Sequence, residues 1–403
     1  MENKNEDDIV GVWLNLKIDL RNTDGIFDKS SKIKCFNVFI IMKSCFIART
    51  ENNKIKCYDQ QSFVSHGENI LFKINYSGVK ASINNPTLNI NMEQSEENIN
   101  LINNNIWYVV NSEDKNGVNE NDDYYLSEND IIKFGKVKYI VKEIHFENKS
   151  FNNDNNVKIF NTNYICKEHK ECEYCKGLMV RLCDCKEFEH FQCIKDWINN
   201  RILPGKENKL VKSYYFSIFQ CKEYIYKKCK EEKCEKKGCC KRCYTYYPLR
   251  FKLNENDNSF KDFYEIKIPE KCDYLILESL THQDKTSNSP KIEKDIHVIK
   301  LTEENITLGR DKTNHAILPD SSICKEHSVI KYIKDKGKLL LKNKSKKTGT
   351  LVLIKETTID LSEKEKYFQK DKTFISARLI KKKEVKNLIK DLKDNEMFRI
   401  VEL

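Results

Sequence analysis

Residues that commonly bind metal come in close pairs between Cys166 and Pro248, a stretch that holds twelve of the seventeen cysteines of the chain. A short turn lets both side chains of such a pair reach one ion, and thiolates with an imidazole suit tetrahedral zinc. Eight such ligands predict two closed sites, so we expect two Zn²⁺ ions as cofactors. The four pairs are Cys172-x-x-Cys175, Cys183-x-Cys185, His190-x-x-Cys193 and Cys240-x-x-Cys243.

The same stretch offers more ligands than two sites need. Cys221 could replace Cys240, or the extra cysteines could form a third site, and the sequence leaves both alternatives open. Apolar residues are too few for a core, so metal binding should supply the free energy of folding. Because no secretory signal precedes the cysteines, we expect metal ligands rather than disulfides, in a protein that is intracellular: cytoplasmic, nuclear or ciliary. The remaining candidates are Cys166, His169, Cys229, Cys234 and Cys239.

One helix and one loop are predicted inside this stretch. FQCIKDWINNRI places Ile194, Trp197, Ile198 and Ile202 on one helical face, and Trp197 should pack against the metal-binding turns. The Lys-rich residues 206–237 predict a loop insertion.

Residues 172–248 resemble the RING-CH zinc finger, including the Trp four residues after Cys193. The resemblance implies interleaved sites. Cys172, Cys175, His190 and Cys193 would bind one ion, and Cys183, Cys185, Cys240 and Cys243 the other.

The RING-CH resemblance also implies a ubiquitin-protein ligase, which positions a charged conjugating enzyme and has no catalytic nucleophile of its own. Tyr174 and Trp197 would then contact this partner. The chain departs from active ligases at Tyr244, where a cationic residue is common, and the spacer between Cys185 and His190 is short. Whether the protein is an enzyme is therefore left open.

A second set of residues suits an anion. Gly309-Arg310, Asp320, His327 and Thr348-Gly349-Thr350 follow one another between short apolar runs. They resemble the ligand loops of the forkhead-associated (FHA) domain, a β-sandwich that binds phosphothreonine peptides. The resemblance implies that Arg310, Lys325 and Thr348 contact the phosphopeptide and that His327 braces the loops, because a phosphate dianion needs a guanidinium and hydrogen-bond donors.

The departures from the FHA pattern fall on the ligand-binding positions. Cys324-Lys325 stands where the family has Ser-Arg, and Thr348-Gly349 stands where it has Asn-Gly. A thiol is a weak hydrogen-bond donor. A sandwich that docks partners without binding phosphate is the alternative.

The first 150 residues predict another β-sandwich. Val12, Leu14, Leu16, Ile18 and Leu20 alternate with other residues, as expected of a strand with one apolar face. YYLSENDIIKFGKVKYIVKEI, residues 124–144, resembles the closing strands of an FHA sandwich. This domain is either a degenerate copy of the second sandwich or similar by chance.

The predicted fold is multidomain and mainly β, with FHA-type sandwiches flanking a small α+β zinc-stabilised domain. The order resembles a group of ciliate proteins that combine FHA and RING-CH modules. The expected segments are a β-sandwich at 9–150, a RING-CH domain at 163–250, an FHA domain at 270–385 and a C-terminal helix or tail at 386–403.

Composition limits the function further. The chain has 403 residues, 33% of them charged, and a net charge of +10, which indicates either a lysine-rich composition or an acidic partner. No apolar run reaches the ~18 residues that span a bilayer. The leading hypothesis is a zinc-binding adaptor of ubiquitin-ligase type with a protein-interaction module. The alternatives are a non-catalytic assembly protein with an acidic cytoskeletal or ciliary partner and, last, nucleic-acid binding through the Lys-rich insertion.

Overall fold

The structure is a computed structural model that describes part of the chain. The described residues are 9–21, 27–41, 44–59, 69–76, 81–84, 106–111, 123–147, 168–171, 173, 176–181, 188–199, 202–216, 250–251, 253–254, 261–262, 266–267, 269–280, 294–355, 358–361, 364–381, 383–385 and 398–401.

The described chain is mainly β, as predicted, and the apolar alternation of the sequence produces the cores. In β1 (Ile9–Asp19), Leu14, Leu16 and Ile18 are fully buried, and the residues between them are more exposed. A strand places successive side chains on opposite faces, so one face of β1 packs into a core.

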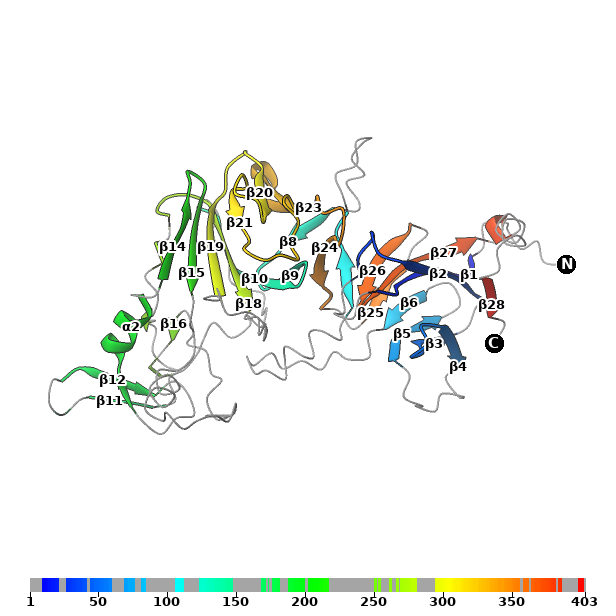
Figure 1. Ribbon diagram of the computed structural model, residues 1–403, viewed down its shortest axis with the longest axis horizontal. Coiled ribbons are helices and arrows are strands. Elements are labelled where there is room, and N and C mark those ends of the chain that lie inside the picture. The colour runs from blue at the N-terminus through cyan, green and yellow to red at the C-terminus, as the bar shows by residue number, and fades with distance from the viewer. Residues whose placement is uncertain are drawn as a thin grey trace.

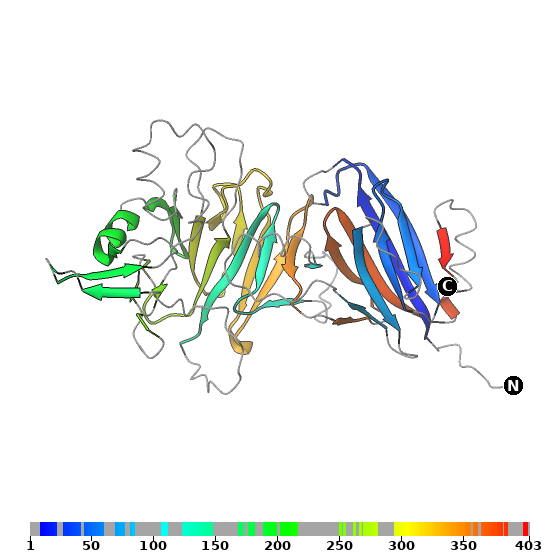
Figure 2. The same ribbon diagram turned by 90° about the horizontal axis from the view of Figure 1, so that it is seen from below.

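Two β-sandwiches lie side by side and share a 13-stranded sheet (Figures 1 and 2). A five-stranded sheet covers each half of it, and each sandwich encloses its own apolar core. The order of the long sheet is β14-β15-β19-β18-β10-β9-β24-β7-β26-β27-β1-β2-β28.

Ten of the described strands form the two facing layers of the first sandwich, and β28 adds at its edge. In the shared sheet these are β1, β2 (Ile33–Ile41), β7 (Trp107–Val109), β26 (Lys366–Lys370) and β27 (Thr373–Lys381). The covering sheet has the order β25-β6-β5-β3-β4, with β25 (Thr358–Asp360), β6 (Ala81–Asn84), β5 (Asn69–Tyr76), β3 (Cys45–Arg49) and β4 (Ile55–Asp59).

The second sandwich repeats this order. Its part of the shared sheet contains β19 (Lys294–Lys300), β18 (Tyr274–Leu280), β10 (Val137–His145), β9 (Ile131–Phe134) and β24 (Thr350–Leu353). The covering sheet has the order β21-β20-β22-β23-β8, with β21 (Ala316–Ile317), β20 (Ile306–Gly309), β22 (Ser328–Ile333), β23 (Lys338–Asn343) and β8 (Tyr124–Leu126). A short 3₁₀ helix, η2 (Lys334–Lys336), joins β22 to β23.

The two halves of the chain exchange their last three strands. β8, β9 and β10 close the second sandwich, where β10 pairs with β18 and β8 with β23. β25, β26 and β27 close the first sandwich, where β27 pairs with β1 and β25 with β6. The predicted segments 9–150 and 270–385 therefore do not coincide with the sheets. Alternating hydrophobicity identifies a strand with one buried face, but it does not say which of two similar cores that face covers.

A hairpin from the cysteine-rich stretch extends the second sandwich. β14 (Ile202–Glu207) and β15 (Val211–Phe216) add to the edge at β19. The prediction of a loop insertion at 206–237 was therefore wrong for β15, whose inward residues Val211, Ser213 and Tyr215 are buried. The rest of that segment, 217–237, lies outside the described residues.

Buried polar residues connect this hairpin to the sandwich. Ser213 Oγ lies 2.8 Å from His297 Nδ1, and His297 Nε2 lies 2.7 Å from Asp295 Oδ2. Tyr139 donates its hydroxyl proton to the same carboxylate oxygen at 2.6 Å. The order Ser–His–Asp is that of a hydrolase triad, but all three residues are buried, His297 completely. A substrate cannot reach them, so we assign the series a structural role.

The remaining elements are small. Three strands, β11 (Glu168–Glu171), β12 (Leu178–Arg181) and β13 (Glu189–His190), form a separate sheet, and β16 (Arg250–Phe251) pairs with β17 (Lys261–Asp262). The helix predicted in FQCIKDWINNRI is confirmed over Phe191–Asn199 as α2. The prediction was wrong for Ile202, which begins β14 and does not belong to the helix. No described helix is long and apolar enough to cross a membrane.

The C-terminal tail differs from the predicted helix where it is described. Residues 383–385 are helical, but Phe398–Val401 form strand β28, which pairs in parallel with β2. Residues 386–397 of the predicted helix or tail lie outside the described residues.

Candidate functional site

Three loops at one end of the second sandwich carry the predicted phosphopeptide residues. They are residues 310–315, 318–327 and 344–349, and we call them the apex. Backbone hydrogen bonds hold the first two together: Arg310 N donates to Cys324 O at 3.0 Å, and Asp311 N donates to Lys325 O at 3.1 Å. The predicted contact residues Arg310 and Lys325 are thus neighbours in space.

Gly309 is required by the close approach of these loops. A Cβ atom at this position would lie 2.2 Å from the carbonyl oxygen of Lys325. The same oxygen accepts a hydrogen bond from Asn314 Nδ2 at 2.6 Å. The guanidinium of Arg310 follows directly, exposed and without a hydrogen bond or ion pair to any residue that the structure describes.

His327 braces two of the loops from inside, as the FHA resemblance implied. It is fully buried; its Nδ1 accepts a hydrogen bond from Cys324 N at 3.1 Å, so Nε2 carries the proton and donates to Gly349 O at 3.0 Å. Burial lowers the pKa of His327 to about 4. The imidazole is therefore neutral at physiological pH and acts as a fixed link between the loops.

The two residues that depart from the FHA pattern have different surroundings. Cys324 Sγ lies 3.1 Å from Ser345 Oγ, which also accepts a hydrogen bond from Gly349 N at 3.2 Å. The thiol therefore ties loops together. The hydroxyl of Thr348 is buried and has no hydrogen-bond partner within the described structure, which leaves a donor at the apex.

Cations dominate the exposed surface of the apex. Arg310, Lys325, Lys346 and Lys347 are exposed. The carboxylate of Asp311 accepts hydrogen bonds from the backbone and hydroxyl of Thr313, both at 3.0 Å, and these bonds lower its pKa. Its charge is therefore already partly compensated.

The first half of the chain supports the apex through the β9–β10 turn. Lys136 N donates to Ser322 Oγ at 2.8 Å, and the carboxylate of Asp320 accepts a hydrogen bond from Ser322 N at 2.8 Å. Gly135 has φ +60°, and a Cβ there would lie 2.5–2.8 Å from atoms of Ser322. This contribution was not predicted, although the Phe-Gly-Lys in residues 124–144 indicates a turn.

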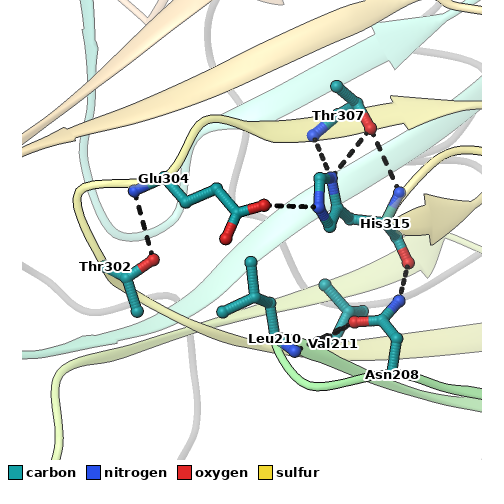
Figure 3. A network of polar contacts seen from close by, with 7 residues as sticks. All are labelled: Asn208, Leu210, Val211, Thr302, Glu304, Thr307 and His315. Atoms are coloured by element: carbon teal, nitrogen blue, oxygen red, sulfur yellow. Dashed lines mark hydrogen bonds and ion pairs between the residues drawn. The ribbon is translucent and has the colours of Figure 1, made fainter.

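The β14–β15 hairpin holds the other side of the apex (Figure 3). Asn208 Nδ2 donates to His315 O at 2.8 Å, and its Oδ1 accepts from Leu210 N and Val211 N. Thr307 N donates to His315 Nδ1 at 3.2 Å, so the proton is on Nε2, which lies 3.3 Å from Glu304 Oε1. Asn208 thereby fixes the segment that follows Arg310.

Of the eight predicted zinc ligands, the structure describes only two, His190 and Cys193. His190 ends β13 and is half-buried, and Cys193 lies exposed in the first turn of α2. Trp197 belongs to α2, and Tyr174 lies outside the described residues, as do Cys172, Cys175, Cys183, Cys185, Cys240 and Cys243. The described residues contain no group of three metal ligands. The two zinc sites and the partner surface at Tyr174 and Trp197 stay predictions.

Comparison with known proteins gives one assignment. No curated protein and no solved structure matches the chain. The FHA domain family matches residues 306–366, from β20 into β26, and no RING-CH family match is found. The matched residues include all the apex loops, from Arg310 to Gly349. The chain therefore contains an FHA domain, a protein-interaction module, at residues 306–366.

Proposed function

We propose that this protein is an adaptor whose apex binds phosphothreonine in a partner protein. The observation that carries the proposal is the guanidinium of Arg310, which is exposed and unpaired within the described structure. Arg310 follows Gly309, where the backbone of Lys325 comes too close to leave room for a side chain. Lys325 lies beside it through the Asp311 N–Lys325 O hydrogen bond. A guanidinium and an ammonium on braced loops suit a phosphate dianion, which forms charge-assisted hydrogen bonds.

Thr348 and Cys324, which depart from the usual FHA pattern, have different proposed roles: Thr348 contacts the ligand, and Cys324 holds the loops together. The unpaired hydroxyl of Thr348 supplies the third donor, and binding a ligand would relieve the cost of a buried polar group without a partner. Cys324 contributes through its link to Ser345 rather than as a phosphate donor.

The test is binding of the full-length protein to a library of phosphothreonine peptides and their unphosphorylated forms. Arg310→Ala should lower the affinity for the selected peptides by about 10- to 100-fold, as expected for a hydrogen bond to a charged group. The matched control is Lys336→Ala, because Lys336 is exposed in η2, which follows the end of β22 remote from the apex. Equal binding of phosphorylated and unphosphorylated peptides would exclude the proposal.

The cysteine-rich stretch supplies a second proposed activity, a zinc-binding RING-CH module with ubiquitin-ligase function. Its support is that His190 and Cys193, two residue types that bind zinc, lie three positions apart around the start of α2. Zinc would stabilise this module by cross-linking its turns.

Metal analysis and a ligase assay separate these alternatives. We expect two zinc ions per chain, and fewer would contradict the ligand assignment. We also expect ubiquitin chains with at least one conjugating enzyme and their loss in Trp197→Ala. A protein that binds two zinc ions but forms no chains would instead be a non-catalytic assembly protein.

A further inference from the structure

A loop of the first sandwich lies against the FHA apex of the second. The loop joins β1 to β2, and its described parts are residues 20–21 and 27–32. Lys29 N donates a hydrogen bond to Lys347 O at 3.0 Å. Lys347 belongs to the loop that contains Thr348, so this contact places the first sandwich at the rim of the proposed phosphothreonine site.

Buried groups hold this loop in place. Asp19 is completely buried, and its carboxylate accepts hydrogen bonds from Arg21 N and Asp28 N, both at 3.0 Å, and from the Ser31 hydroxyl. Phe27 is also buried, with its ring centroid 5.5 Å from that of Phe374. The position of Lys29 is therefore fixed by the fold.

The loop adds an exposed cation to a row of exposed cations. Lys29, Lys346 and Lys347 are exposed, and none forms an ion pair with a described residue. The nearest carboxylate of the loop, Asp28, accepts hydrogen bonds from Ser30 N at 2.8 Å and from the Ser30 hydroxyl at 2.6 Å. We call Lys29, Lys346 and Lys347 the basic wall.

The basic wall is connected to the phosphate-binding residues through a short series of contacts. Arg310 N bonds to Cys324 O, Cys324 Sγ lies 3.1 Å from Ser345 Oγ, and Ser345 directly precedes Lys346. An extended peptide advances ~3.3 Å per residue. The wall is therefore within reach of peptide residues close to a phosphothreonine held by Arg310.

We propose that the basic wall selects phosphothreonine ligands that carry acidic side chains close to the phosphothreonine. The inference rests on the proposed phosphothreonine binding and adds the kind of partner, an acidic phosphopeptide. The contribution of Lys29 comes from the first sandwich, outside the matched FHA residues. Complementary charge across an exposed rim changes affinity modestly and depends on salt.

The experiment uses the full-length protein and three peptides with the same phosphothreonine, flanked by Asp, Ala or Lys. Wild type should bind the Asp-flanked peptide most tightly and lose this preference at high salt. Lys29→Glu should weaken binding of that peptide by about threefold to tenfold, because it replaces one exposed attraction by a repulsion. It should change the Ala-flanked peptide by less than about twofold and strengthen the Lys-flanked peptide.

Lys336→Glu is the charge-matched control and should change none of the three affinities, since η2 follows the other end of β22. The double variant Lys346→Glu/Lys347→Glu repeats the test if Lys29→Glu unfolds. If Lys29→Glu changes the affinity of all three peptides equally, or changes none of them, the proposed selection by the basic wall is wrong. Phosphothreonine binding itself would still stand. If wild type binds no phosphopeptide, both proposals fail together.

Discussion

His327 offers a quantitative test of the apex, because its neutral form is built into the fold. Replacing His327 by Ala removes a buried ring and leaves Cys324 N–H and Gly349 C=O without their partner. Unpaired buried groups and a cavity together should lower the free energy of unfolding at pH 7.5 by about 2–4 kcal/mol.

The same residue predicts a pH dependence with a definite sign. The folded pKa of about 4 lies below the value of about 6.5 in an unfolded chain. The stability linked to the neutral ring is therefore fully present above pH 6.5 and is lost as pH falls towards 4, because the unfolded chain binds the proton first. The full loss corresponds to ~3 kcal/mol.

Urea unfolding of wild type and His327→Ala, followed by circular dichroism between pH 7.5 and 4.5, measures both effects. Other titrating groups contribute equally to the two proteins, so the stability difference isolates His327. This difference should shrink by about 2–3 kcal/mol across the range. A difference that stays constant would refute the assignment of a buried, neutral imidazole.

Three further changes test the contacts that hold the apex and the exchanged strands in place. Gly135→Ala should lower the melting temperature and weaken peptide binding, because a Cβ would lie 2.5–2.8 Å from atoms of Ser322. Asn208→Asp should cost about 1–3 kcal/mol in urea unfolding, because it places a charged acceptor opposite the carbonyl of His315. A protease site inserted at 151–156 and cut should leave both pieces together on size-exclusion chromatography, because each piece completes the other's sandwich.

Each of these has a matched comparison. Asp371, in the β26–β27 turn of the first sandwich, has φ +48° and so accepts glycine. Asp371→Gly should leave peptide affinity unchanged, and a loss equal to that of Gly135→Ala would show that the effect is not local. For Asn208, Ala is the comparison: it loses the bonds from Leu210 N and Val211 N as well as the bond to His315 O, so it should cost at least as much as Asp. Separation of the cut pieces in native buffer would contradict the strand exchange.

Alternating hydrophobicity predicted β1 correctly, because one face of this strand has to be apolar. Leu14, Leu16 and Ile18 are buried as their spacing indicates. The partner of each strand was not predictable. β10 carries the same alternation whichever core it covers, and the choice depends on contacts far away in the sequence.

In the apex, too, residues on contiguous loops were predictable from the sequence, whereas contributions from distant parts of the chain were not. The sequence predicts that Arg310, Lys325, Thr348 and His327 belong to neighbouring loops, because the segments that carry them are contiguous and have recognisable residues. Contact of Arg310, Lys325 and Thr348 with a phosphopeptide stays a prediction. Contributions from outside the domain were missed: the Gly135 turn, the Asn208 turn and Lys29 reach the apex only through the sheet arrangement. The strand β15 was missed because its lysine-rich neighbourhood suggested a loop.

The exchanged strands also determine when each core can be completed during synthesis. In the first sandwich, Leu14 on β1 is paired opposite Ala377 on β27, so every residue between these two must leave the ribosome before this sheet is complete. The second sandwich, in contrast, receives β8–β10 from residues made earlier. Contacts of such high sequence separation slow folding, and the uncovered apolar face of β1 is exposed in the meantime. The strands of the first sandwich that are translated early are therefore expected to reach their final packing late. Until then, we expect chaperones to bind their uncovered apolar face.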